Sequence, residues 1–194
     1  MDGSARRCPW AGDRLSIEYH DREWGVPVHN DQELFEFVLL EFFQAGLSWS
    51  TLLKKRENFR EAFDGFDFRK IACYGKEKKQ QLLTNKGIIR NRRKIDAAVH
   101  NACVFMNIRK QYGSFDSYIW SFVNDQPIDN EWETMEEVPA STGLSDIISR
   151  DMKKQGFVFF GTTICYAFMQ AIGMVNDHLV GCFRYPRILR MRKK

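Results

Sequence analysis

Apolar residues recur at helical spacing over most of this chain, and one segment is apolar on nearly every side. That segment begins at Leu34 and runs through Phe43, a pattern typical of a buried helix. Asp31 stands where an N-cap belongs and Glu33 falls in the first turn, so we expect the helix to begin there. The rest of the predicted fold is arranged around this helix.

Further helices are predicted where apolar positions keep helical spacing, and loops where Gly and Pro interrupt it. The predicted helices cover residues 49–55, 58–63, 68–73, 76–84, 88–112, 114–123, 144–155 and 162–174. Residues 1–30 show little periodicity, and residues 124–143 have the composition of a surface connection. No alternating run is convincing enough for a sheet and no internal repeat occurs, so the predicted fold class is all-α.

Length, charge and cysteine usage narrow the class of protein. A chain of 194 residues suits one domain or two small lobes, and its basic excess, 29 residues against 25 acidic ones, is modest. No apolar run reaches the roughly 20 residues of a membrane span, so we expect a soluble intracellular protein. The five cysteines are widely spaced, which argues against a disulfide framework and leaves metal ligation or plain burial.

One carboxylate and one amide interrupt the apolar segment. Glu41 and Gln44 share a helix face, and an ionised carboxylate in such surroundings costs several kcal/mol unless it is paired. Trp49 follows closely, and the aromatic-rich N-terminal segment adds Tyr19 and Trp24. These residues could line one concave site. The alternative is a core glutamate held by a backbone amide or an arginine, with Trp49 as ordinary packing.

Two pairs of cysteine and histidine lie near the two ends of the chain. His178 and Cys182 are four residues apart and would share a helix face, and Cys8 and His20 are twelve apart. Two cysteines and two histidines can form a closed tetrahedral site of the structural zinc type, which would bring both ends of the chain to one place. The alternative is a buried cysteine and a hydrogen-bonded histidine.

Glycines bracket an apolar turn between the last two predicted helices, over residues 156–163. Gly156 and Gly161 allow a tight hairpin whose backbone N–H groups can point at a phosphate, with Thr162 and Thr163 capping the next helix. This is the sequence form of a helix-hairpin-helix anchor for the DNA backbone. A hairpin that only joins two packed helices is the alternative.

A basic run further upstream suits phosphate contacts, or is a solvated helix face. It comprises Lys76, Lys78, Lys79, Lys86, Arg90, Arg92, Arg93 and Lys94.

Short motifs follow one another along almost the whole chain. They are Cys8-Pro9-Trp10, Tyr19-His20-Asp21, Glu23-Trp24-Gly25, Gln44-Ala45-Gly46-Leu47-Ser48-Trp49, Leu53-Lys54-Lys55-Arg56, Gly87-Ile88-Ile89-Arg90, Trp120-Ser121-Phe122-Val123-Asn124, Gly161-Thr162-Thr163-Ile164-Cys165-Tyr166, Asn176-Asp177-His178 and Gly181-Cys182. In this order they resemble the DNA-3-methyladenine glycosylase I family, bacterial enzymes of the helix-hairpin-helix glycosylase superfamily that remove alkylated adenine from DNA.

The resemblance implies roles for particular residues. It implies a zinc ion held by Cys8, His20, His178 and Cys182. It implies a base pocket made by Glu41, Tyr19 and Trp49, with Trp24 nearby, and a DNA contact at Gly46 and Leu47. The hairpin pattern predicts further DNA contacts at Gly156, Gly161 and Thr162. The loop at Gly46 and Leu47 would fill the gap left when the base leaves the duplex. Asp177 abuts a zinc ligand, so we expect it to be structural, and it is the second candidate for a catalytic residue after Glu41.

Some positions depart from the family pattern. Phe42 and Phe43 replace smaller or polar residues, and Ser16 stands where some members have a tyrosine. These departures bear on pocket shape and base selectivity.

The expected activity is hydrolysis of the N-glycosidic bond of 3-methyladenine in alkylated double-stranded DNA, without lyase activity, by a monomer in the bacterial cytosol. Residues 1–186 would form a single glycosylase domain and residues 187–194 a basic C-terminal tail. The rival interpretations are a zinc-stabilised DNA-binding module without catalysis and a glycosylase for another base.

Overall fold

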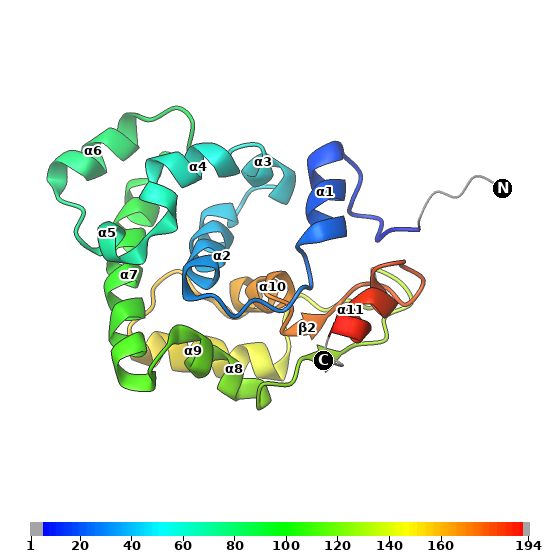
Figure 1. Cartoon of the computed structure of the whole chain (residues 1–194). Helices are drawn as coiled ribbons and strands as arrows, with labels where there is room; N and C mark the ends of the chain where they lie inside the picture. Colours follow the sequence, from blue (N-terminus) through cyan, green and yellow to red (C-terminus); the bar gives the residue numbers. More distant parts are fainter. Residues whose placement is uncertain (1–5, 192–194) are drawn as a thin grey trace.

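The structure is a computed structural model that describes residues 6–191. Its helices are α1 (Arg14–Arg22), α2 (Asp31–Gln44), α3 (Trp49–Leu53), α4 (Arg56–Ala62), α5 (Phe68–Ala72), α6 (Lys76–Thr84), α7 (Arg92–Tyr112), α8 (Phe115–Trp120), α9 (Gly143–Gln155), α10 (Thr162–Ala171) and α11 (Tyr185–Met191). Two short 3-10 helices, η1 (Asp64–Phe66) and η2 (Ser121–Val123), lie among them. Helices dominate the fold, as the sequence analysis predicts (Figure 1).

One small sheet was not predicted. The strands β1 (Ile128–Asp129) and β2 (Val175–Asn176) pair in parallel, with Ile128 opposite Val175 and Asp129 opposite Asn176. A strand of two residues cannot show alternation, so periodicity could not reveal it. Within residues 6–191, no helix is both long enough and apolar enough to cross a membrane.

Helix α2 lies in the middle of the fold, with α7 on one side and α1 on the other (Figure 1). All of its residues from Leu34 to Phe43 are buried, which confirms the predicted core helix. The Phe43 ring packs on the Phe59 ring of α4, with centroids 4.9 Å apart, and the Phe35 ring packs on the Phe105 ring of α7 at 5.0 Å. Aromatic contacts to two different helices hold α2 in a fixed position.

The predicted N-cap of α2 is wrong by one residue, and the predicted start of α7 is wrong by four. Asn30, not Asp31, caps α2, because its side chain accepts hydrogen bonds from backbone N–H groups of the first turn. Asp31 instead accepts a hydrogen bond from Arg109 of α7. Helix α7 begins at Arg92 rather than at residue 88, because Asn91 caps it through the backbone N–H three residues later.

The first and last described segments lie side by side. The backbone N–H of Phe183 donates to the carbonyl of Arg6 at 2.9 Å. Helix α1, which the sequence analysis missed, is capped by Asp13. Helix α11 takes in residues 187–191, which were predicted to belong to the tail, and its Ile188 is fully buried. Residues 192–194 of the predicted tail lie outside the described residues.

Helices α9 and α10 are joined by a tight hairpin over residues 156–161. Gly156 ends α9 in a left-handed conformation with φ of 110°, and Gly161 is the N-cap of α10. The side chain of Asn101 on α7 exchanges two hydrogen bonds of 3.0 Å with the backbone of Val158. A tight turn therefore joins α9 to α10, and hydrogen bonds from Asn101 hold this turn against α7.

We expect Ile188→Ala to destabilise the protein if α11 is part of the fold. Ile188 is 0% exposed, so its truncation should lower the free energy of unfolding by about 2–4 kcal/mol. Ile147, which is 53% exposed on α9, provides a matched control, and Ile147→Ala should change that free energy by less than about 0.5 kcal/mol. Urea unfolding measures both. Equal, small effects would show that α11 is an appendage.

Candidate functional site

A cavity of about 560 Å³ opens between α1, the end of α2, the start of α3 and α10. The sequence-predicted pocket residues Tyr19, Trp24, Glu41 and Trp49 all line it. The structure therefore brings together residues from α1, α2 and α3 and from the segment that follows α1. A volume of this size is in the range of small-molecule sites.

Buried polar atoms in the cavity wall are left without partners. The hydroxyl of Tyr19 and the Nε1 of Trp49 are buried and make no hydrogen bond within the described chain. Their rings lie 5.2 Å apart at an angle of 46°. A buried donor without a partner costs about 1–3 kcal/mol, so both residues keep a hydrogen-bonding capacity beside the cavity that the described chain does not use. The wall thus combines aromatic surface with unused hydrogen-bonding groups.

Glu41 is 4% exposed, and no group of the described chain hydrogen-bonds its carboxyl. Burial raises its pKa to about 8, so the free protein holds this carboxyl largely protonated at neutral pH. Burial and the charge of Glu41 also raise the pKa of Tyr19 well above its usual value. A purely structural glutamate would need a partner such as an arginine. Arg56 does not serve as that partner, because its guanidinium forms ion pairs with Glu23 and Glu36.

Asp177 also lines the cavity, but its surroundings are the opposite of those of Glu41. One of its oxygens accepts hydrogen bonds from Asn130 at 2.7 Å and Trp132 at 3.0 Å. The other accepts from Tyr166 at 2.6 Å and Gln170 at 2.7 Å. Four donors hold this buried carboxylate in place, which is the arrangement of a structural group.

Trp10 and Gln170 are among the cavity-lining residues that were not predicted as site residues. Trp10 lines the cavity and packs edge-on against Trp24, with centroids 5.0 Å apart. Gln170 lines it from α10. The signal that singled out Glu41, a polar side chain inside an apolar helix, also marks Gln170. Trp10 lies two positions after the predicted ligand Cys8 in a segment with few core positions.

The loop between α2 and α3 lies beside the cavity. Gly46 has a φ of 86°, a conformation that favours glycine. Leu47, which is 40% exposed, is held through its backbone, because the Gln44 amide donates to its carbonyl at 2.6 Å and its N–H donates to the Gln44 carbonyl at 2.7 Å. The loop therefore presents an apolar side chain to solvent from a constrained backbone.

The helix cap expected at the hairpin and the exposure expected of the basic run are only partly present in the structure. The hydroxyl of Thr162 binds Ser145 at 2.8 Å and does not cap α10, whose N-cap Gly161 has no side chain to do so. In the basic run, Lys78 pairs with Asp64 and Lys79 pairs with Asp96, and Lys94 is buried. The exposed members are Lys76, Lys86, Arg90, Arg92 and Arg93.

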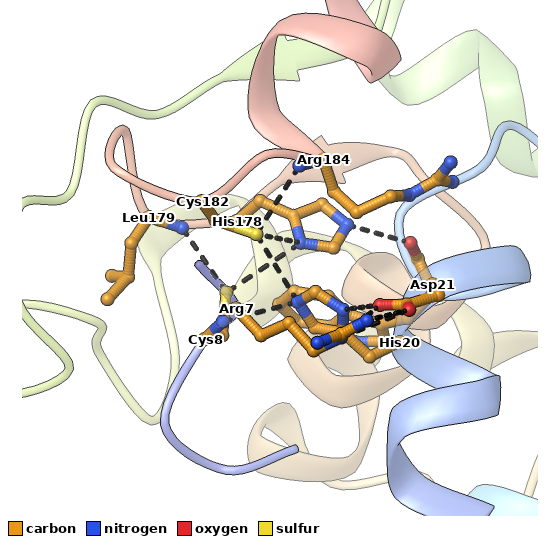
Figure 2. Close-up of polar contacts among 9 residues, drawn as sticks. Arg7, Cys8, His20, Asp21, His178, Leu179, Cys182 and Arg184 are labelled. Atoms are coloured by element: carbon orange, nitrogen blue, oxygen red, sulfur yellow. Dashed lines mark hydrogen bonds and ion pairs between the residues drawn. The ribbon is translucent and has the colours of Figure 1, made fainter. Parts of the chain in front are cut away.

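Cys8, His20, His178 and Cys182 converge into one buried cluster, as Figure 2 shows. One ligand atom from each lies within 4.8 Å of all the others. The Cys182 Sγ is 3.4 Å from the His20 Nε2 and 3.8 Å from the His178 Nδ1, and the Cys8 Sγ is 3.7 Å from that Nδ1. Bonds of about 2.0–2.3 Å to a central ion would place tetrahedral ligand atoms about 3.3–3.8 Å apart. The donor set fits such an ion.

The groups behind the cluster fix which ring nitrogen faces it. His20 Nδ1 lies 2.8 Å from the Asp21 carboxylate, and His178 Nε2 lies 3.0 Å from the Trp24 carbonyl. Both partners can only accept, so these nitrogens carry the protons and the opposite nitrogens present lone pairs to the cluster. Burial lowers the pKa of His178, which favours the neutral form that a metal ligand requires.

Comparison with known proteins agrees with this geometry. A family model described as methyladenine glycosylase matches residues 10–185. The chain belongs to the methyladenine glycosylase family. It is 50% identical over 181 residues to DNA-3-methyladenine glycosylase 1 of Escherichia coli (strain K12), which covers 93% of this chain and 97% of that protein. The family membership inferred from the sequence is therefore confirmed.

Solved structures of relatives share the fold. A crystal structure of 3-methyladenine DNA glycosylase I has a TM-score of 0.89 at 49% identity and covers 93% of this chain and 100% of that one. A Staphylococcus aureus 3-methyladenine DNA glycosylase I, described for its recognition of 3-methyladenine, has a TM-score of 0.90 at 34% identity, covering 95% and 98%.

The departures from the family pattern fall in different places. Phe42 and Phe43 are fully buried, and neither lines the cavity. The Phe43 ring instead packs on α4, as described above. Ser16 does line the cavity, and its hydroxyl donates to the Asp13 carboxylate at 2.8 Å. Of the three, only Ser16 can act on the pocket by direct contact.

We expect Glu41→Gln to change how stability depends on pH. The pKa of Glu41 is about 8 in the folded chain against an ordinary 4.5, so its contribution is fully present below about pH 4.5 and is lost as pH rises through 8. The free energy of unfolding of the wild type relative to Glu41→Gln should fall by at least about 1.4 kcal/mol from pH 5 to 8.5. Urea unfolding at several pH values measures this, with Glu33→Gln, exposed on α2, as the control. Parallel pH profiles for wild type and Glu41→Gln would contradict an elevated pKa.

Proposed function

We propose that this chain is a DNA glycosylase of base-excision repair that hydrolyses the N-glycosidic bond of 3-methyladenine in alkylated double-stranded DNA and leaves an abasic site. The observation that carries the proposal is the cavity, where the unpaired polar atoms of Tyr19 and Trp49 and the Glu41 carboxyl lie in an aromatic wall. Family membership supports it, and the relatives named above carry this activity in their names.

The glycosidic bond cannot be reached while the base is stacked, so the base must leave the duplex and enter the cavity. Methylation at N3 makes the adenine cationic, and aromatic rings such as those of Trp49 and Tyr19 attract a cation by about 0.5–2 kcal/mol. The cation also lowers the cost of ionising Glu41, which can then accept a hydrogen bond from the adenine amino group. A cationic base is a good leaving group, so the enzyme can work mainly by stabilising the flipped, separating state.

DNA contacts follow from the surface around the cavity. Leu47, exposed on its constrained loop, would take the place of the extruded base, with Gly46 allowing the turn. The hairpin at Gly156 and Gly161 and the exposed members of the basic run would contact phosphates, which are read by charge rather than by sequence. We place the protein on chromosomal DNA in the bacterial cytosol as a monomer.

The proposed chemistry is hydrolysis without lyase activity. A lyase forms a Schiff base through an amine, and no lysine occurs among the described residues that line the cavity. Glu41 is the proposed catalytic residue, and Asp177, with both oxygens fully hydrogen-bonded, is proposed to hold the cavity wall.

We propose that Cys8, His20, His178 and Cys182 hold one structural Zn²⁺. With four protein ligands, no position would remain for water, so the ion would join the two ends of the chain and take no part in the reaction. The backbone N–H groups of Leu179 and Arg184 point at the Cys8 and Cys182 sulfurs, at 3.5 and 3.4 Å, which favours thiolates there (Figure 2).

Metal analysis should find about one zinc ion per purified chain. Cys182→Ser should lose the ion and expose residues 8–24 to hydrogen exchange, because the link that holds them to the C-terminal segment is gone. Cys103→Ser, which changes an exposed cysteine, should keep the ion. Wild-type protein without stoichiometric metal would contradict the zinc proposal.

Release of free 3-methyladenine from alkylated duplex DNA tests the function directly. Glu41→Gln should lower the single-turnover rate by about 10²-fold, because it keeps the shape but not the charge. Trp49→Ala should weaken binding of the base, and Glu33→Gln should match the wild type. DNA binding without release of any base would favour the non-catalytic module, and release of a different base from a lesion panel would change the substrate. A folded but inactive Asp177→Asn beside a fully active Glu41→Gln would reverse the two roles.

A further inference from the structure

Lys94 belongs to the basic run, yet it lies buried beneath the loop that joins α2 to α3. Its side chain is on α7, and its residue is 8% exposed. The Nζ donates to the carbonyl of Phe43 at 2.9 Å and to the carbonyl of Ala45 at 2.8 Å. The last carbonyls of a helix have no partner within it and carry partial negative charge. The Lys94 ammonium therefore caps the C-terminus of α2 from a neighbouring helix.

This contact fixes the start of the loop that carries Leu47. Ala45, whose carbonyl Lys94 binds, is the C-cap of α2, and Gly46 follows in its left-handed conformation. On the other side, Gln44 binds the backbone of Leu47. The loop is held at its first residue by the ammonium and at Leu47 by the amide, so its backbone has little freedom between them.

The same contact connects the loop to the cavity. Glu41 lies on the last turn of α2, whose carbonyls Lys94 binds, and Trp49 is the first residue of α3, immediately after the loop. A shift at Ala45 would change the position of Leu47 relative to both cavity residues. Misplacement by about 1 Å can cost about 10²-fold in rate.

We propose that Lys94 is a positioning residue for base flipping: it holds the loop at residues 45–48 so that Leu47 occupies the vacated space in the duplex while Glu41 and Trp49 receive the base. This rests on the proposed function. A loop that is already ordered loses less conformational entropy when it enters the duplex. With two donors committed to carbonyls under the loop, Lys94 is not a phosphate contact, unlike Arg92 and Arg93 on the same helix.

Lys94→Met, which nearly keeps the volume and removes the donors, tests this role. Single-turnover release of 3-methyladenine from duplex DNA should fall by about tenfold or more, while release from single-stranded DNA and binding of free 3-methyladenine change by less than about twofold. Metal content should stay the same. Lys110→Met, at the exposed far end of α7, is the matched control and should behave as the wild type. Equal losses on all substrates, or no loss, would overturn the proposal.

A double-mutant cycle with Leu47→Ala separates positioning from general stability. If Lys94 acts through Leu47, adding Lys94→Met to Leu47→Ala should cost less than about twofold further on duplex DNA, whereas independent effects would multiply. If Lys94→Met does not fold, Lys94→Gln, which keeps one donor, enters the same cycle with the same criterion. Wild-type protein that releases no 3-methyladenine refutes the proposed function, whereas an active wild type with multiplying effects refutes only the role of Lys94.

Discussion

The cavity depends on a connection between the two ends of the chain. Its walls come from α1, from the α2 and α3 region and from α10, and the segments before α1 and after β2 are held together by the cluster of Cys8, His20, His178 and Cys182. Trp24, which lines the cavity, is part of this connection, because its carbonyl accepts a hydrogen bond from His178. A close backbone approach adds to this connection. Gly173 lies so near the backbone of Val26 that a Cβ atom at position 173 would be only 2.4 Å from the Val26 carbonyl carbon. The N-terminal wall of the cavity is thus kept in place by groups that never face a ligand.

Two buried carboxylates in the same cavity wall illustrate how surroundings assign roles. Asp177 has four hydrogen-bond donors and Glu41 has none within the described chain. Hydrogen-bond donors stabilise the ionised form of a buried carboxylate and fix its position. Without such partners, ionising a buried carboxyl costs free energy, and its oxygens remain available to a ligand. The apolar contacts of α2 offset that cost, because Phe35 and Phe43 pack on two different helices and hold Glu41 at the cavity without any polar contact of its own.

How much could be predicted from the sequence depended on whether a signal was local. The apolar length of α2 and the isolated Glu41 are local patterns, and the structure contains that helix, with Glu41 among the residues that line the cavity. The pairing of β1 with β2 and the convergence of the four cysteines and histidines depend on folding over long distances, and spacing alone left the second open. Ile188 lies among basic residues, so the composition of this segment predicted a tail rather than helix α11 with its buried isoleucine. Residue type alone also could not tell that Lys94 is buried under a loop while Lys86 is exposed, because that depends on where α7 crosses α2.

The burial of Glu41 gives the proposed enzyme a physical basis for choosing a cationic base. In the free protein the carboxyl is mostly protonated at neutral pH, because its pKa is about 8. A neutral adenine in the cavity does little to offset the cost of ionising it, whereas a methylated, cationic adenine favours the ionised form through direct Coulomb attraction in a site of low dielectric. Under the proposed function, the ion pair would then form only with the damaged base, and the aromatic rings of Tyr19 and Trp49 would add to the same preference. A glutamate with a permanent arginine partner would already be ionised and neutralised, and would lose this discrimination. The absence of a partner for Glu41 within the described chain is therefore the feature on which selectivity would depend.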